Sequence, residues 1–544
     1  MAEKKTKTKT IAKNIIKSVL GQVPFTAELY WMTRHRGKTL NSRFSLKNLS
    51  DRLPEMVKVI KKRRDDITQP GKKIFIFATL HYWIEHAMTT GMVLSGMGHD
   101  VTLGYLPYHD WQNTINKFDL RRQNLYAKEV LSKAEPVLPS ISFLDIHAGY
   151  KVLPEELEAK IQEVTRYDTM YTLQVENVDE NSEIFKLRSE RNLRAARAAL
   201  AWMNENKPDV VIVPNGTIQE FGVIYEVARF LEIKTVTYEF GDQRQRIWIA
   251  QDDKVMRQDT TDMWEVFEND ELTRTEKSKI REMFEARRKA SIWKNFSRLW
   301  QQVPAQGVEM ARDALGLDDR PVVLLATNVL GDSLTLGRET FSQSMEEWLE
   351  RTLQYFAGKD GAQLIVRVHP GEVLIHGQSM MDVVERVLPF LPENIRVIGP
   401  EEKVNTYDLI AAADLGLVYT TTVGLEMAMS GVPVVVAGKT HYRGRGFTND
   451  PTGWVNYYKT IKAILEDGDA HKLEKEQIDR AWAYAYRFFF DFPLPFPYHL
   501  VHLWDDYKKQ SVREIFHARE WRKHEAVFEY LSGTDIDWKE IRGK

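Results

Sequence analysis

Two series of short strand-like runs constrain the fold of this chain more than any other feature. The first series comprises KIFIFATL (73–80), HDVTLGYL (99–106), PDVVIVPNG (208–216) and IKTVTYEFG (233–241). The second comprises PVVLLATN (321–328), QLIVRVHPG (363–371), NIRVIG (394–399), DLGLVYT (414–420) and VPVVVAG (432–438). Segments of helical period alternate with these runs, a pattern typical of parallel sheets covered by helices. The sequence therefore predicts an α/β protein with two separate βα series.

The length of 544 residues exceeds what one hydrophobic core usually supports, so two domains with extensions are expected. We place the parts as follows: a helical, basic extension at 1–70, a first α/β domain with a helical insertion at 71–302, a linker at 303–320, a second α/β domain at 321–480 and an aromatic-rich helical tail at 481–544. Arg487, Asp491 and three prolines interrupt the apolar run of the tail. We therefore expect it to pack back across the domains and not to anchor the chain in a membrane.

Composition excludes several functional classes. The formal net charge of −2 argues against a nucleic-acid partner. The absence of cysteine excludes disulfides, thiolate metal sites and a cysteine nucleophile. No run of about 18 uncharged apolar residues occurs, and the N-terminus lacks the apolar core of a signal peptide, so we expect a cytoplasmic protein.

The N-terminal extension allows a peripheral contact with a membrane. Its apolar residues could form one helical face beside Lys13 and Lys17 and rest on an anionic surface. A tail docked on the protein itself would have the same sequence. The apolar positions are Ile11, Ile15, Ile16, Val19 and Leu20.

Polar residues follow several predicted strands, at the edge of the sheet where ligands of open α/β folds bind. After the run 73–80 come His81, Glu85 and His86, which are side chains able to accept a proton from an alcohol. They could equally be a carboxylate favoured at a helix N-terminus and two hydrogen-bonded histidines.

Two further strand ends of the first series, those of the runs 208–216 and 233–241, carry Asn215, Glu239 and Asp242. A carboxylate at such an end suits acid–base chemistry or contacts with substrate hydroxyls. Turn formation explains Asn215 equally well, because asparagine favours turns.

In the second series, strand alternation puts Arg367 and His369 on one face before Pro370 ends the ladder. A cation and an imidazole that leave a strand together suit a phosphate, since both donate hydrogen bonds to anionic oxygens. A structural arginine and a packed histidine would give the same pattern.

The stretch LVYTTTVGLEMAMSG predicts a strand, a turn at Thr420, Thr421 and Thr422, and a short helix from Val423 to Ser430. The turn suits an anion, because the first N–H groups of a helix lack partners within it. Gly424 would admit a ligand close to the backbone, and Glu426 comes one residue too late for a capping box. Plain helix capping remains the alternative reading.

These motifs together resemble the capsular polysaccharide synthesis family of glycosyltransferases, which includes enzymes that transfer Kdo. The likeness rests on VRVHPGE, NTYDLIAAADLGLVYTTTVGLEMAMSGVPVVVAG and HYRGRGFTNDPTGW, and in the first half on NGTIQEFGVIYEVARFLEIKTVTYEFGD. The resemblance implies a GT-B fold, in which two Rossmann-like βαβ domains face a cleft and a C-terminal helix crosses over. The chain lacks the tandem-module length of the Kdo-transferring members, which leaves Kdo as the donor sugar in doubt.

The resemblance also implies roles for individual residues. The second domain would hold the donor, a nucleotide sugar, with no metal and no further cofactor. The donor-binding residues would be Arg367, His369, Thr420, Thr421, Thr422, Gly424, Glu426, Tyr442 and Arg443, with Gly444 in the same loop.

The first domain would bind a saccharide or lipid-linked acceptor, with His86, Asn215 and Asp242 on that side. For the base that activates the acceptor hydroxyl, Glu85 or His81 ranks first and Glu239 third, with His369 acting on the donor phosphate. Two alternatives remain open: a non-hydrolysing sugar-nucleotide epimerase, and a non-catalytic scaffold that binds sugar nucleotides.

Overall fold

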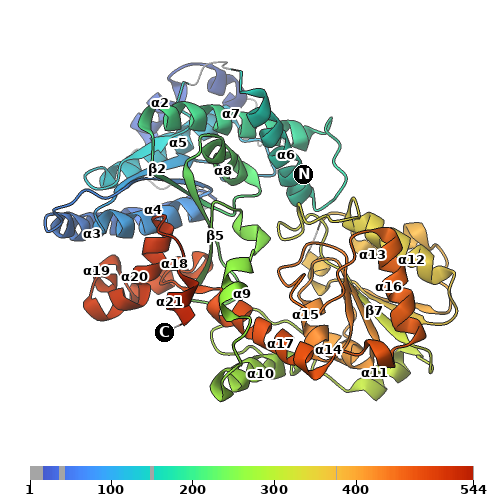
Figure 1. Cartoon of the computed structure of the whole chain (residues 1–544). Coiled ribbons are helices and arrows are strands. Elements are labelled where there is room, and N and C mark those ends of the chain that lie inside the picture. The colour runs from blue at the N-terminus through green and yellow to red at the C-terminus, as the bar shows by residue number, and fades with distance from the viewer. Residues whose placement is uncertain (1–15, 36–42, 148–151, 375, 543–544) are drawn as a thin grey trace, which may run out of the picture.

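The computed structural model describes residues 16–35, 43–147, 152–374 and 376–542, which form two lobes side by side (Figure 1). The predicted apolar positions Ile11 and Ile15 lie outside the described residues. Within the described ranges, no helix is both long and apolar enough to span a bilayer.

The first lobe contains a seven-stranded sheet with the strand order β12-β6-β5-β4-β1-β2-β3. The order β3-β2-β1-β4-β5 within it is parallel and is that of a Rossmann half. The runs predicted from sequence correspond to β1, β2, β4 and β5, whereas β3 and the antiparallel β6 were not predicted. The strands are β1 (Lys73–Thr79), β2 (Asp100–Leu106), β3 (Ser140–Ser142), β4 (Val210–Pro214), β5 (Lys234–Glu239) and β6 (Arg246–Gln251).

Helices cover both faces of this sheet, as parallel strands require. Helices α6, α7 and α8 pack together, and α3 packs on α4. β1 is buried at six consecutive positions, which explains why it reads as an unbroken apolar run. The helices are α3 (Lys47–Arg64), α4 (His81–Gly96), α5 (Lys117–Leu131), α6 (Glu155–Leu173), α7 (Glu183–Asn206) and α8 (Gln219–Phe230).

The second lobe contains a five-stranded, wholly parallel sheet with the order β11-β10-β7-β8-β9. It repeats the order of the first lobe, so the predicted pair of Rossmann-like domains is confirmed. All five strands of the second series were predicted. They are β7 (Val322–Ala326), β8 (Gln363–Arg367), β9 (Ile395–Ile398), β10 (Leu415–Val418) and β11 (Val434–Val436).

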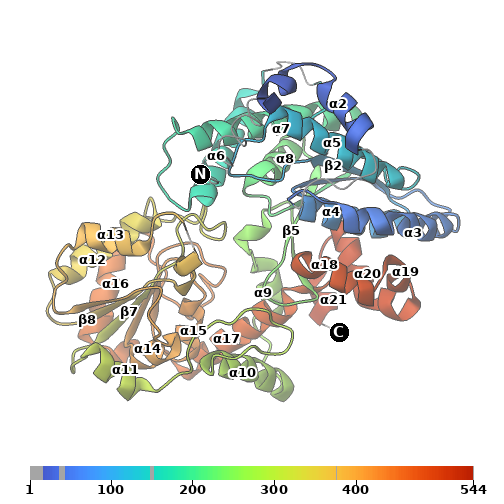
Figure 2. The ribbon, with the colours of Figure 1, turned by 180° about the vertical axis from the view of Figure 1, so that it is seen from behind.

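Side chains of β7 alternate between two cores, because successive residues of a strand point to opposite faces. Val323 and Leu325 pack with α12 (Met345–Ala357), α13 (Met380–Val387) and α16 (Trp454–Glu466). Val322 and Leu324 join the larger core, which also contains residues of α14 (Thr406–Ala412) and α15 (Val423–Met429). Helix α11 (Val308–Leu315) lies in the segment predicted as a linker and packs on α14 (Figure 2).

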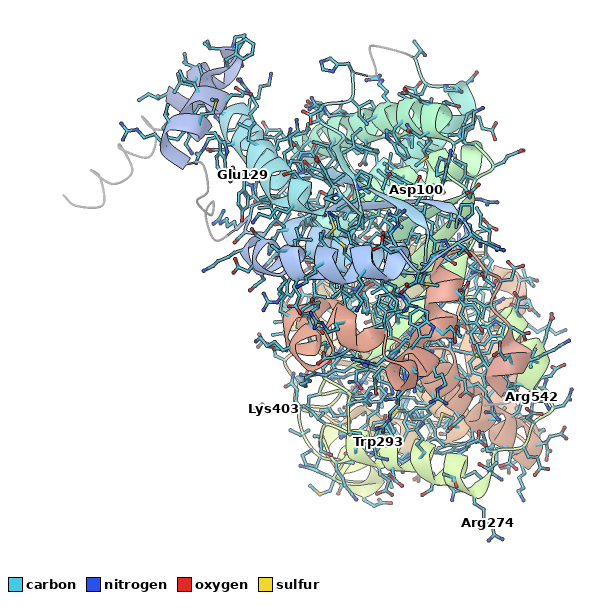
Figure 3. All side chains as sticks on the ribbon, turned by 90° about the vertical axis from the view of Figure 1, so that its left-hand side faces the viewer. Asp100, Glu129, Arg274, Trp293, Lys403 and Arg542 are labelled. Carbon is cyan, nitrogen blue, oxygen red and sulfur yellow. The ribbon has the colours of Figure 1, made fainter. Side chains whose placement is uncertain are left out.

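The C-terminal tail crosses from the second lobe to the first. Helix α17 (Lys475–Tyr486) contacts α15 and α10 (Arg274–Arg288), and β12 (Leu494–Pro495) then pairs with β6. The red-toned helices that follow lie directly below the blue helices of the first lobe (Figure 3). They are α18 (Leu503–Lys509), α19 (Val512–Ile515), α20 (Ala518–Leu531) and α21 (Trp538–Arg542).

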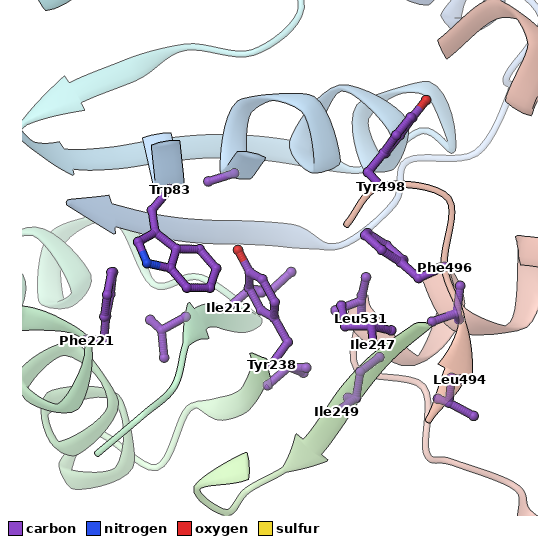
Figure 4. Packing of buried hydrophobic residues seen from close by; sticks show 14 of the residues in the cluster. Trp83, Ile212, Phe221, Tyr238, Ile247, Ile249, Leu494, Phe496, Tyr498 and Leu531 are labelled. Atoms are coloured by element: carbon purple, nitrogen blue, oxygen red, sulfur yellow. The ribbon is translucent and has the colours of Figure 1, made fainter. Parts of the chain in front are cut away.

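Tail residues complete the core of the first lobe. Phe496 and Leu531 lie beside Ile247 and Ile249 of β6 and near Tyr238 of β5 (Figure 4). Phe496 and Leu531 are both fully buried. The first lobe therefore depends on residues from both ends of the chain.

Candidate functional site

A cleft of about 750 Å³ lies where the carboxyl ends of strands from both sheets meet. Such ends are where open α/β sheets bind ligands. The first lobe contributes residues that follow β4 and β5, and the second lobe contributes residues that follow β7, β8, β10 and β11. Among the lining residues are Asn215, Glu239, Asp242, Arg298, Asn328, Asp332, His369, Thr420, Thr421, Thr422 and Lys439.

His369 presents a hydrogen-bond donor on the second-lobe wall. Its Nδ1 accepts from the backbone N–H of Gly371 at 3.0 Å, so in the neutral ring the proton is on Nε2. Burial, together with the nearby cations Arg298 and Arg367, lowers the pKa of His369 to about 4. A Cβ at position 371 would lie 2.8 Å from Nδ1, so glycine is needed there. His369 is therefore a neutral donor at neutral pH.

Three threonines lie beside it at the turn before α15, as the sequence predicts. The backbone N–H of Thr420 donates to Asn328 Oδ1 at 3.2 Å, which fixes the turn. The buried Thr420 Oγ1 has no partner within the described part of the chain. Thr422 is the N-cap of α15 but makes no side-chain cap hydrogen bond. Thr421 Oγ1 accepts from the N–H of Val423 at 3.4 Å, so capping uses this hydroxyl but not those of Thr420 and Thr422.

Two exposed cations, Arg298 and Lys439, also line the cleft, and neither was predicted from the sequence. Arg298 lies within electrostatic range of His369 and Asp332 in the second lobe and of Asp242 in the first. Lys439 directly follows the predicted strand VPVVVAG, so the strand-end rule could have found it. Arg298 lies in a segment without regular structure, where no such rule applies.

Glu239 is the carboxylate of the first-lobe wall. The carboxylate accepts hydrogen bonds from the backbone N–H of Phe240 at 3.0 Å and from Asn215 Nδ2 at 3.3 Å. Burial raises the pKa of Glu239 to about 7, although these two hydrogen bonds act to lower it. Asn215 adopts a left-handed backbone with φ of 59°, and its Oδ1 accepts from the N–H of Thr217 at 3.1 Å. The turn therefore holds the amide that orients Glu239.

Tyr171 lies within electrostatic range of carboxylates on both walls of the cleft. Burial raises the pKa of this phenol to about 12, assisted by Asp332 of the second lobe and Glu239 of the first. Burial also raises the pKa of Asp242, whereas the positive charge of Arg298 acts to lower it. The cleft thus combines Glu239 and Asp242 of the first lobe with the neutral imidazole of His369, hydroxyls, Asp332 and Lys439 of the second, and Arg298 lies near carboxylates of both.

The lobes also touch along an edge formed by the end of α6. Both carboxylate oxygens of Glu176 accept from backbone N–H groups at the start of α12, those of Met345 at 2.9 Å and Glu346 at 2.7 Å. Gly331 and Gly377 admit backbone carbonyls of the α6 end, which a Cβ would obstruct. These contacts bridge the two lobes near the cleft.

Three predicted residues of the first lobe do not line the cleft. Glu85 is buried, where it accepts from Trp504 Nε1 at 2.9 Å and from the N–H of Leu49 at 3.4 Å. His86 is fully buried, with Nε2 3.1 Å from the carbonyl oxygen of Tyr498, and burial lowers its pKa to about 3. His81 begins α4 outside the cleft lining. The partners Trp504 and Tyr498 come from the tail, which covers this region.

Two predicted residues of the second lobe are likewise held away from the cleft lining. Arg367 donates to the carbonyl oxygens of Gly399 at 2.7 Å and Glu402 at 3.4 Å. Arg443 donates to the carbonyl oxygen of Val436 at 2.7 Å. Both arginines therefore fasten loops behind the wall.

Gly424 and Tyr442 form one packing unit behind the threonines. The Tyr442 hydroxyl donates to the carbonyl oxygen of Thr421 at 2.7 Å, and a Cβ at position 424 would collide with that hydroxyl. Glycine at 424 thus makes room for Tyr442. None of the predicted loop residues Tyr442, Arg443 and Gly444 lines the cleft, whereas the preceding residues Lys439, Thr440 and His441 do.

Glu426 is buried in an ion pair with α10. Arg287 of α10 donates to Glu426 Oε1 at 3.0 Å, and both side chains are less than a tenth exposed. The Arg287 guanidinium also lies 4.0 Å from the centre of the Trp300 ring. Glu426 does not line the cleft, so this carboxylate supports the fold behind the cleft wall.

Replacing Glu426 by alanine is expected to destabilise the fold by about 3 kcal/mol, because Arg287 would remain buried without its counter-charge. Urea unfolding monitored by circular dichroism measures the loss. A double variant, Glu426→Leu with Arg287→Met, should recover much of it. Glu265→Ala on the exposed face of α9 (Thr261–Phe267) is the control. A loss for Glu265→Ala equal to that for Glu426→Ala would contradict a stabilising role of the ion pair.

Among the residues that the structure describes, no three His, Asp or Glu side chains gather as potential ligands of a metal ion.

Comparisons with known proteins address the family. Residues 252–463 match the model of the family described as capsule polysaccharide biosynthesis protein. The matched range contains the second-lobe motifs on which the resemblance to capsular polysaccharide synthesis enzymes was based. The motif at 215–242 lies outside the match. No curated protein matches the sequence significantly.

Solved structures show distant similarity. The β-Kdo 2,4 transferase KpsC of Thermosulfurimonas dismutans aligns with 51% of this chain and 79% of its own, at 16% identity and a TM-score of 0.30. UDP-GlcNAc 2-epimerase from Neisseria meningitidis aligns with 77% and 99%, at 12% identity and a TM-score of 0.24. Sucrose-phosphate synthase from Thermosynechococcus elongatus aligns with 76% and 94%, at 15% identity and a TM-score of 0.27.

Proposed function

We propose that this chain, whose residues 252–463 belong to the capsule polysaccharide biosynthesis family, is a glycosyltransferase. It moves a sugar from a nucleotide-sugar donor to a growing cell-surface polysaccharide or glycolipid. One observation carries the proposal: the interlobe cleft sets a neutral imidazole donor and free hydroxyls opposite a carboxylate whose pKa is near 7.

The second-lobe wall suits the phosphate of the donor. His369 Nε2–H and the hydroxyl of Thr422 can donate hydrogen bonds to phosphate oxygens, and Arg298 and Lys439 supply positive charge. Such preorganised donors stabilise the charge that develops on a leaving phosphate. In this proposal, protein side chains perform this role without a metal ion.

The first-lobe wall suits the acceptor. The Glu239 carboxylate takes the proton of the acceptor hydroxyl while that oxygen attacks the anomeric carbon. The bond from the anomeric carbon to the phosphate oxygen breaks, and the nucleotide leaves with the electron pair. A base with a pKa near 7 is ionised often enough to act and basic enough to accept the proton. Glu239, third in the sequence-based ranking, thereby replaces Glu85 and His81 as the proposed base.

A panel of CMP-, UDP- and GDP-sugars tests the proposal. The full chain should bind one of them, measured by isothermal titration calorimetry, and release its nucleotide when a saccharide or lipid-linked acceptor is added. Failure to bind any donor would refute it.

The same panel separates two rival functions. An epimerase would convert a UDP-sugar without an acceptor, which NMR of donor plus protein detects. A non-catalytic scaffold would bind the donor and release no nucleotide, and replacing Glu239 and His369 together would leave its role unchanged.

A further inference from the structure

Exposed apolar side chains cluster at the N-terminal end of the described chain. Of the nineteen large hydrophobic residues that are exposed within the described ranges, seven lie between residues 16 and 32. Single exposed apolar residues are ordinary, but a contiguous group marks an interaction site. We name six of them the N-terminal apolar surface: Ile16, Val19, Val23, Phe25, Leu29 and Met32.

The spacing of these residues places them on helical faces. Residues 16–22 are helical, and Ile16, Val19 and Val23 recur at intervals of three and four. Phe25 is the N-cap of α2 (Thr26–Tyr30), and Leu29 and Met32 follow at intervals of four and three. Phe25, Leu29 and Met32 are 78%, 64% and 66% exposed. The apolar stripe therefore faces solvent, the reverse of an ordinary surface helix.

The opposite side of the segment contacts α5. The apolar side chains are therefore exposed on a segment that is docked on the first lobe. Lys17 forms an ion pair with Asp119 at 2.5 Å, and Glu28 pairs with Arg121. Trp31 is buried, and its Nε1 donates to a carboxylate oxygen of Glu129 at 3.1 Å. Figure 3 shows the segment at the outer end of the first lobe, beside Glu129. The chain thus holds its apolar stripe outward by polar contacts beneath it.

Positive charge lies next to the stripe in the sequence. Lys13 precedes Ile16 by three positions, a reach of about 10 Å at most. Arg34 and Lys117 are exposed beside the segment. Five lysines and one acid precede residue 14: Lys4, Lys5, Lys7, Lys9 and Lys13, with Glu3. An apolar stripe beside a basic cluster matches the two attractions of an anionic bilayer, burial of apolar side chains and attraction of lysines to acidic headgroups.

We infer that the N-terminal apolar surface docks on an anionic lipid bilayer, with Phe25, Leu29 and Met32 inserted among the headgroups. A second copy of the chain fits less well, because its own lysines would oppose those of the first. The inference does not depend on the reaction catalysed in the cleft, so each can fail alone.

Co-sedimentation of the full chain with vesicles tests it. The chain should pellet with phosphatidylcholine vesicles that contain about one third phosphatidylglycerol and stay in solution with phosphatidylcholine alone. High salt should weaken the binding. A triple variant with serine at positions 25, 29 and 32 should bind about tenfold more weakly, since the apolar contribution is lost.

The matched control replaces Leu374 and Phe390, which are 82% and 92% exposed on the second lobe, by serine, and should bind as the wild type does. Circular dichroism checks that each variant is folded. The single variant Leu29→Asp, which changes fewer residues, is a second test of vesicle binding. Unchanged binding of the triple variant would overturn the inference, because lysine charge alone would then explain pelleting. Self-association of the wild type that the triple variant abolishes without vesicles would also overturn it.

Discussion

His369→Ala is expected to lower kcat/KM for sugar transfer by about 10²–10³-fold, the loss typical of removing one donor to a developing oxyanion. The effect should fall mainly on kcat, because the Nε2–H bond strengthens as charge builds on the leaving phosphate. Steady-state kinetics with the donor identified by the panel measure it. Donor binding measured by calorimetry should weaken far less.

The pH dependence separates a neutral donor from a cationic one. With the pKa of His369 lowered to about 4 by burial, its protonation state is constant above about pH 5. An imidazolium mechanism would instead lose activity as the pH rises through about 6.5. His369→Gln, which keeps an N–H donor, should retain more activity than the alanine variant. His376→Ala is the control, and an equal loss there would contradict the assignment.

Sequence predicts strands best where both faces are buried. β1 and β7 are apolar without interruption, and runs of this kind identify parallel strands covered on both sides. β12 consists of two residues and exists only because it pairs with β6. β3 has three residues, too few to show a period. These strands depend on tertiary pairing that a local pattern does not contain.

The strand-end rule located most of the candidate site, because it follows from the topology of parallel sheets. It selected Glu239, His369 and the threonine turn, all of which line the cleft. It also selected Glu85, which the tail residue Trp504 covers from 419 positions away in sequence. Such coverage is decided by how the tail packs, and no motif near Glu85 reports it.

Glu426 illustrates the same limit within the second lobe. Its position in the helix after the threonine turn suggested contact with a sugar, but Arg287, 139 residues earlier, neutralises it in the interior. Arg298 shows the converse, since a residue outside any regular element reaches both walls of the cleft. Long-range charge pairing thus separates residues that line the site from residues that support it.

Glu239→Gln is expected to reduce kcat by about 10²–10⁴-fold, because the amide keeps the shape and can still accept hydrogen bonds but cannot take the acceptor proton. Burial raises the pKa of Glu239 from 4.5 to about 7, so the wild-type rate should rise between about pH 5 and about pH 8 as the carboxylate ionises. The residual rate of the variant should lack that rise. Glu265→Gln is the matched control, and a wild-type rate in Glu239→Gln would refute the assignment.

The same substitution should stabilise the fold, which distinguishes a lost base from a damaged site. The unfolded chain ionises Glu239 near pH 4.5 and the folded chain near 7, so the folded state binds more protons in between. Wild-type stability therefore falls as the pH rises from about 4.5 to about 7 and stays lowered above it. Glutamine removes this cost, so the variant should be more stable by about 3 kcal/mol at pH 8 and equal at pH 4. Thermal unfolding at the two pH values measures the difference, and an inactive variant that is also less stable at pH 8 would indicate structural damage and not the loss of a base.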